Sequence, residues 1–445
     1  MDGMSPNNDS KSPQFVGYHE VFPAEITNMI IDYLHGHRNA LKGCSLVCKG
    51  WKASSRHHLF HAVSFSPERV AFSDLLVFLA SSPDVCAYIK EITLSGYRGI
   101  SLKDLRAALH PLRCLRSVTL DRLHISKPNW REPMLEPVVG VLDTLRITSS
   151  NVLGTDLSVF FDLLGLFSKL SALHLCNSLD YSMAIDRHRF DLTTTASDRF
   201  RRVEKLVLRA LPLHALDAIL HRNHNTHRWA SLRTLWMDGC CSTWEHVKRI
   251  GEFIAVIGPQ LREVAVRPHS MLLVRDELLA NGQATVVTIR DTAEDWQALR
   301  LDKCTKLDVF KISVGHDDPM SRQIGKAIFR STVDLLTHLP STAVEVRVGF
   351  APGRERYNLH GNQFRHYRDS LMALDWQALD RTLSADRFEK LRVVLDLGLA
   401  RGTFCMKKCQ ELFKCARHAL PGLDSRNMLE LDFTKEKWWA YDLWH

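Results

Sequence analysis

The chain has 445 residues, of which 45% are hydrophobic and 24% charged, and it carries a formal net charge of +8. This balance is typical of a folded globular protein and excludes a disordered or fibrous chain. No stretch reaches the ~20 consecutive apolar residues of a membrane helix, and the first residues do not resemble a signal peptide. We therefore expect a protein of the cytoplasm, the nucleus or both, without a membrane partner.

Two further features of composition bear on partners. The 11 cysteines have no regular spacing, so we expect free thiols in a reducing compartment. Lysine and arginine are spread along the chain, which favours a solvated basic surface over a nucleic-acid site. Residues 1–15 are rich in Ser, Pro and Asn, and we expect them to form a short disordered tail.

Residues 16–65 are predicted to form a small module of two or three short helices. Apolar residues recur at steps of three and four from Phe22 to Leu34, which places them on one helix face, and Gly36 then gives a stop signal. Isolated helices of this length are marginal, so their apolar faces must pack on each other or on a partner. A second helical stripe is predicted further on, from Leu41, Cys44, Val47, Cys48 and Trp51.

Cysteine and histidine residues near this second stripe raise the alternative of a zinc site. Cys44 and Cys48 lie in a helix-patterned run, and only eight residues separate Cys48 from His57, which is short for a zinc-finger loop. Cysteine is also among the most buried residue types and behaves as a small hydrophobe. We therefore expect these cysteines to pack as apolar side chains, and we predict no metal site and no cofactor.

The run "FPAEITNMIIDYL…ALKGCSLVCKGW" resembles an F-box. The F-box pattern joins a Leu-Pro-x-Glu-Leu start to an Ile-rich first helix and a Leu-Val-Cys/Ser-Arg/Lys-x-Trp end. The following "SSRHHLFHAVSF" is similar to the version found in large F-box families of mushroom-forming fungi. The match covers about residues 21–65, and it departs from the pattern at Phe22, where Leu usually precedes the proline.

The resemblance implies that this module docks on the small Skp adaptor, which links it to a cullin scaffold and so to a ubiquitin-conjugating enzyme. The chain would then be the substrate receptor of a Skp–cullin–F-box ubiquitin ligase and not itself an enzyme. Carried over position by position, the residues expected to face the adaptor are Phe22, Pro23, Ile26, Ile30, Leu46, Val47, Cys48 and Trp51. The alternative for some of them, Trp51 above all, is a place in the module's own core.

Residues 66–445 are predicted to form an irregular leucine-rich-repeat solenoid. A six-residue apolar signature returns at steps of roughly 23 to 33 residues, in or near the leucine-rich-repeat range. Its clear copies begin at Ile89, Leu115, Leu142, Leu170, Val203, Leu232 and Leu261. Weaker copies begin at Ala284, Leu307, Ala343 and Phe388.

Each copy of the signature is predicted to be a β-strand, because its fourth and sixth positions are apolar and point to one face while its fifth points to the other. Helix-patterned stretches lie between copies, for example at 158–167, 245–258, 329–339 and 375–384. We therefore expect an α/β fold, in which F-box helices precede a solenoid with a parallel sheet on its concave side and helices outside. The aromatic segment "EKWWAYDLWH" is expected to cap its last repeat.

Fifth-position residues are expected to line the concave face, which repeat proteins commonly use for binding. They are Thr93, Thr119, Arg146, His174, Val207, Trp236, Ala265, Thr288 and Lys311, and the third position adds Glu91, Lys205 and Glu263. Among them Arg146, His174, Trp236 and Lys311 are the candidates for binding a target protein. Trp236 is the expected main contact, because Trp and Arg dominate many interfaces. The alternative is that Trp236 lies under a loop.

The sequence contains no phosphate-binding G-x-x-x-x-G-K-[ST] loop, no H-E-x-x-H zinc motif and no G-x-S-x-G nucleophile elbow. We therefore predict no catalytic residues. A function of another class stays open, a non-catalytic repeat scaffold or a nucleic-acid-associated protein whose helical module is only a structural cap. The net charge of +8 is the feature that favours this alternative.

Overall fold

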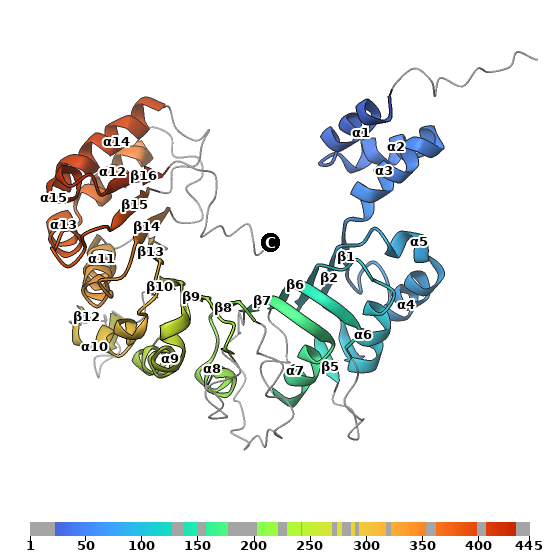
Figure 1. The fold of residues 1–445 in the computed structure, drawn as a ribbon, viewed down its shortest axis with the longest axis horizontal. Coiled ribbons are helices and arrows are strands. Elements are labelled where there is room, and N and C mark those ends of the chain that lie inside the picture. The colour runs from blue at the N-terminus through green and yellow to red at the C-terminus, as the bar shows by residue number, and fades with distance from the viewer. Residues whose placement is uncertain are drawn as a thin grey trace, which may run out of the picture.

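A computed structural model describes most of the chain. The described residues are 23–126, 137–148, 157–176, 203–220, 229–241, 243–268, 274–277, 286–289, 293–316, 322–352, 362–397 and 406–432. They form an α/β arc in which the strands line the inner side and most helices cover the outer side (Figure 1). The expected α/β class with a large parallel sheet is thereby confirmed. The predicted tail at 1–15, Phe22 and the predicted aromatic cap at 436–445 lie outside the described residues.

The arc is built on a 12-stranded sheet whose neighbouring strands are all parallel and pair in chain order. Its strands are β1 (Ala62–Phe65), β2 (Glu91–Ser95), β4 (Ser117–Asp121), β6 (Val139–Thr148), β7 (Phe167–Cys176), β8 (Lys205–Arg209), β9 (Thr234–Asp238), β10 (Glu263–Arg267), β13 (Val309–His316), β14 (Glu345–Pro352), β15 (Arg392–Asp396) and β16 (Leu429–Asp432). A parallel pair cannot be joined by a tight hairpin, so successive strands of this sheet require crossover connections.

From β2 to β14 the pairing registers bring equivalent signature positions side by side. Thr93 pairs with Thr119, which pairs in turn with Arg146. In the strands of the main sheet from β2 to β14 the fourth and sixth positions are buried, as Ile92 and Leu94 are in β2. The predicted alternation of buried and inward-facing residues is therefore confirmed for these strands. The copy that begins at Phe388 is displaced by two residues, so that its fifth position, Arg392, pairs with the third position of β14, Glu345.

Helices cover the outer face of the sheet (Figure 1). In chain order they are α4 (Phe72–Ser81), α5 (Pro83–Cys86), α6 (Leu102–Leu109), α7 (Leu157–Leu164), α8 (Leu213–Leu220), α9 (Trp244–Ile257), α10 (Ala293–Gln297), α11 (Arg322–Thr337), α12 (Asn362–Met372), α13 (Trp376–Leu383), α14 (Met406–Ala419) and α15 (Pro421–Ser425), with the short 3-10 helices η5 (Gly258–Gln260) and η7 (Leu301–Lys303). One continuous apolar core, from Leu75 to Met428, connects them to the sheet. The four helical stretches predicted from the sequence correspond to α7, α9, α11 and α13.

Two small sheets depart from the predicted pattern. β3 (Arg98–Ser101) pairs in parallel with β5 (His124–Ser126), and β11 (Val274–Glu277) pairs in antiparallel fashion with β12 (Val286–Ile289). The prediction that the copy beginning at Ala284 adds a strand to the main sheet is therefore wrong. Its strand β12 takes a local partner, and β13 occupies the place beside β10. Thr288 accordingly does not belong to the fifth-position row.

The amino-terminal module consists of α1 (Ala24–Tyr33), α2 (Arg38–Val47) and α3 (Lys49–Phe60). Its core is small and is formed by Ile31, Leu41 and Leu59, with Leu34, Trp51 and Phe60 packed against it. The single helical stripe predicted from Leu41 to Trp51 is wrong. Cys48 has an extended backbone, with φ −162° and ψ 170°, so the helix is interrupted there and α2 and α3 are separate helices.

A short connection joins the module to the sheet, because only His61 separates α3 from β1. The His61 carbonyl oxygen accepts hydrogen bonds from the amides of Lys90 and Glu91, at 3.0 and 2.9 Å. Phe60 packs against both the module's core and the core of the repeats. β1 falls inside the range 16–65 that the sequence assigns to the module, and it pairs with β2 as the first strand of the sheet.

Two expectations from composition can be compared with the described part of the chain. The cysteines whose side chains the structure describes are free thiols. None of the described helices combines the length and the apolar character needed to cross a membrane.

Gly251 lies in α9 where the helix approaches the chain just after α10. A Cβ at this position would lie 1.7 Å from the carbonyl oxygen of Ala298. Gly to Ala inside a helix is ordinarily stabilising by about 1 kcal/mol. For Gly251→Ala we expect instead a loss of about 1–3 kcal/mol in the free energy of unfolding, because the helix must shift away from its neighbour. Urea denaturation followed by circular dichroism measures this loss.

The matched control is Gly43→Ala in α2, where nothing lies within 4 Å of an added Cβ. This substitution should be neutral or slightly stabilising. An unfolding curve of Gly251→Ala that coincides with the wild-type curve would contradict the close contact between α9 and Ala298.

Candidate protein-binding sites

The helical module exposes large apolar side chains on α1 and at the end of α2. Leu46 is 86% exposed and Val47 is 63% exposed, while Ile26 and Ile30 on α1 are each 41% exposed. Met29 and Tyr33 of α1 are exposed as well. The remaining exposed large apolar residues of the described chain are spread over the array, at Val77, Phe78, Val141, Val256 and Val344. A concentration of apolar surface of this kind is typical of interaction sites, which makes α1 and α2 the first candidate site.

The adaptor-facing residues predicted from the sequence separate into two groups. Ile26, Ile30, Leu46 and Val47 lie on the surface, together with Pro23, which precedes α1. Trp51 packs at the edge of the small core, which is the alternative the sequence left open for it. Cys48 is half-buried at the break between α2 and α3.

Polar contacts hold α1 against α3. His58 Nε2 lies 2.7 Å from Asp32 Oδ1, and Ser54 donates a hydrogen bond to Asn28 Oδ1 at 2.5 Å. Burial lowers the pKa of His57, and the nearby Lys90 lowers it further. Within the described residues no group of three or more His, Cys, Asp or Glu side chains is placed to hold a metal ion.

The second candidate site lies on the concave face of the main sheet, where the four predicted target-binding residues occupy one row. Arg146 pairs directly with His174. Val207 separates His174 from Trp236, and Ala265 separates Trp236 from Lys311. Val207 and Ala265 are themselves buried, so the longer, half-buried side chains around them form the surface.

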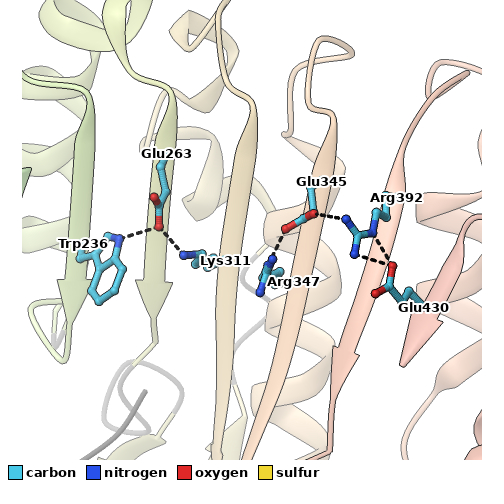
Figure 2. Close-up of polar contacts among 7 residues, drawn as sticks. All are labelled: Trp236, Glu263, Lys311, Glu345, Arg347, Arg392 and Glu430. Atoms are coloured by element: carbon cyan, nitrogen blue, oxygen red, sulfur yellow. Dashed lines mark hydrogen bonds and ion pairs between the residues drawn. The ribbon is translucent and has the colours of Figure 1, made fainter. Parts of the chain in front are cut away.

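Trp236 is held within this surface by charged neighbours (Figure 2). Its indole Nε1 donates a hydrogen bond to Glu263 Oε1 at 2.9 Å, and the same oxygen lies 2.5 Å from Lys311 Nζ. Lys205 Nζ lies 3.6 Å from the centroid of the indole ring, a cation–π contact worth about 0.5–2 kcal/mol. The indole is therefore fixed in place by both its N–H and its ring.

A second group of charges continues along the face toward β16 (Figure 2). Glu345 forms ion pairs with Arg347 and with Arg392, whose Nη1 lies 3.2 Å from Glu345 Oε2. Arg392 also pairs with Glu430, at 2.5 Å. These pairs connect three neighbouring strands, so the charges also fix the side chains across the sheet.

Arg209, Asp238 and Arg267 form a third group, which sequence reasoning missed. Asp238 lies 3.3 Å from Arg209 and 3.6 Å from Arg267, and Arg267 is nearly buried. Each of the three residues comes directly after the sixth position of its signature, on the same face as the third and fifth positions. Extending the two-residue period by one step would have revealed them.

Burial is the largest cause of the pKa shifts of the side chains in the middle of this face. It lowers the pKa of the His174 imidazole to about 3, with Arg146 and Lys205 as further causes. It also lowers the pKa of Arg146 and of Lys205. For Lys205 the charge of Glu263 acts in the opposite direction, and the like charge of Lys311 lowers the pKa further. His174 is therefore neutral at physiological pH, and the charge of this region comes from partly desolvated Arg and Lys side chains.

No protein-family model matches the sequence, and no curated protein matches it. The function must therefore be inferred from the chain's own residues and their arrangement.

The half-buried His174 should make stability sensitive to acid. Its pKa is about 3 in the folded protein and near 6.5 when unfolded, so the unfolded chain binds the proton more readily between these values. Stability should fall as the pH falls through this window, by roughly 2 kcal/mol from this group between pH 7 and pH 5. His174→Gln should remove this contribution, so the variant should lose less stability on acidification than the wild type.

Urea unfolding at pH 7 and at pH 5 measures the difference for each protein. His110→Gln, at an exposed histidine at the end of α6, is the control and should keep the wild-type difference. The same acid-induced loss in His174→Gln and in the wild type would show that His174 is not a half-buried neutral side chain.

Proposed function

We propose that this chain is the substrate receptor of a Skp–cullin–F-box ubiquitin ligase. In this proposal α1–α3 are the F-box, and the strand–helix units that follow are an irregular leucine-rich-repeat solenoid. The protein is not an enzyme; it binds the Skp adaptor through the helical module and a target protein through the concave face. The observation that carries the proposal is the exposed apolar surface of α1 and α2, on the segment whose sequence resembles an F-box.

The energetics of this surface support a docking role. An apolar side chain that is fully removed from water contributes about 1.5–3 kcal/mol, so residues such as Leu46 and Val47 would be among the main contributors to binding. The module itself has few buried residues, Ile31, Leu41 and Leu59. A partner that covers the exposed faces of α1 and α2 would enlarge this small core. Helices that bind in an apolar groove of a partner bury their apolar faces in the same way.

The junction between module and sheet supports the same function. Phe60 belongs to both cores, and the His61 carbonyl is held by two amides of the first repeat. Such a connection would hold the concave face in a fixed orientation relative to the adaptor. A receptor needs this, because the target must be presented to a ubiquitin-conjugating enzyme that is bound elsewhere in the assembly.

Val47→Glu and Val77→Glu form a matched pair for testing the adaptor surface. The two valines are similarly exposed, 63% and 67%, but Val47 ends α2 and Val77 lies on α4 of the repeats. A carboxylate placed in an apolar interface is desolvated without a partner. We expect Val47→Glu to weaken binding of purified Skp adaptor by about 100-fold, equal to about 2.7 kcal/mol, and Val77→Glu to leave it within about twofold.

Isothermal titration calorimetry measures both affinities. The unfolding temperatures of the two variants should match that of the wild type, because both side chains face water. A wild-type chain that does not bind the adaptor, or equal affinities for the two variants, would contradict the proposal.

A further inference from the structure

Positive and negative charges are unequally distributed along the concave face. Between β6 and β14 the cations of this face outnumber its carboxylates. The cations are Arg146, Lys205, Arg209, Arg267, Lys311 and Arg347, and the carboxylates are Asp238, Glu263 and Glu345. A face with this excess attracts an anionic partner.

The carboxylates of this face are each engaged by two donors or more. Glu263 accepts from Trp236 and pairs with Lys311, both through Oε1. Asp238 lies between Arg209 and Arg267, and Glu345 lies between Arg347 and Arg392. Their negative charge is therefore already shared among several cations.

Lys205 takes part in none of these ion pairs. Its ammonium group lies over the Trp236 ring, 3.6 Å from the centroid, and no described carboxylate lies within ion-pair distance of it. An ammonium group has three N–H donors, and the aromatic face replaces only part of the solvation lost on burial. Burial is the largest cause of the lowered pKa of Lys205, and the charge of Glu263, which lies beyond ion-pair distance, offsets it only in part. An incoming carboxylate or phosphate oxygen would supply the missing acceptor.

We propose that this part of the concave face binds an acidic peptide segment of the target protein, with Lys205 as the central cation and Arg146 and Lys311 on either side. The inference rests on the proposed function only in taking the ligand to be a target protein. The chemistry of the ligand follows from the face itself.

The spacing of the cations defines what such a segment looks like. The row crosses from β6 to β13, and neighbouring strands lie about 4.8 Å apart, so Arg146 and Lys311 are roughly 20–25 Å apart across the sheet. An extended peptide covers this distance with about seven residues. Between the two cations lie the neutral His174 and the indole of Trp236. A peptide that fits this row therefore has acidic residues at both ends and in the middle, with an apolar residue between neighbouring acidic residues.

A nucleic acid fits this face less well than an acidic peptide. Asp238 on β9 and Glu263 on β10 lie beside the row, two residues from its members Trp236 and Ala265, and a continuous phosphate backbone along the row would pass these carboxylates. Binding of single strands also relies on a series of stacking aromatic side chains. In the row from Arg146 to Lys311, Trp236 is the aromatic side chain suited to stacking.

Fluorescence anisotropy with labelled probes tests the inference on the full chain. The probes are a short Glu-rich peptide with a Leu between its acidic residues, the same peptide with Gln for Glu, a version with phosphoserine for Glu, and a single-stranded oligonucleotide of similar length. We expect the Glu-rich and phosphoserine peptides to bind, the Gln peptide to bind at least about tenfold more weakly, and affinity to fall between ~50 and ~200 mM salt. The ratio of the Glu to the phosphoserine affinity tells which acceptor the site prefers.

Lys205→Glu should reduce binding of the Glu-rich peptide at least about tenfold. Lys248→Glu is the matched control, since Lys248 is an exposed lysine on α9 at the outer face. Equal affinity of both variants, equal affinity for the Glu and Gln peptides, or tighter binding of the oligonucleotide than of the acidic peptides would overturn the inference. Titration of Skp adaptor into the same preparations separates this outcome from failure of the proposed function, because Lys205 lies far along the chain from α1 and α2.

Discussion

The period of two in each strand determines the architecture of the repeats. Residues at the fourth and sixth signature positions, such as Leu235 and Met237 in β9, are buried against the outer helices. Residues between them, such as Trp236, must then point to the opposite face. Because all neighbouring strands of the main sheet are parallel and in register, these inward residues form continuous rows. The binding surface is thus a direct consequence of how the core is packed.

The fold could be predicted from the sequence where the period of the apolar residues is regular. It could not be predicted where a strand pairs with a neighbour outside the main sheet or where a helix is interrupted. The rows that contain Arg146, His174, Trp236 and Lys311 could be predicted from the signature alone. The pairing of β12 with β11 could not, because an alternating segment does not reveal which strand it joins. Nor did the helical pattern reveal the break at Cys48, since α2 and α3 continue the apolar spacing across an extended residue. The ion pairs between strands depend on register, which only the structure provides.

The two candidate sites differ in physical character. On α1 and α2 the surface is apolar, with residues such as Leu46 directed to water, and it lacks the ion-pair networks seen on the concave face. On the sheet the surface is charged, and side chains such as Glu263 and Lys311 are fixed by one another. Apolar burial suits a constant partner that is bound in the same way each time, whereas a charged, pre-ordered surface contributes selectivity. This division is the one expected of a receptor that joins a common adaptor to a particular target.

Hydrogen exchange of the full chain with and without purified Skp adaptor tests the central claim most directly. Amides in elements that the adaptor covers should exchange more slowly in the complex. The account predicts slower exchange in α1 and α2, from Ala24 to Val47, and unchanged exchange in strands β6 to β13. Slower exchange confined to the strands, or no change anywhere at saturating adaptor, would contradict it.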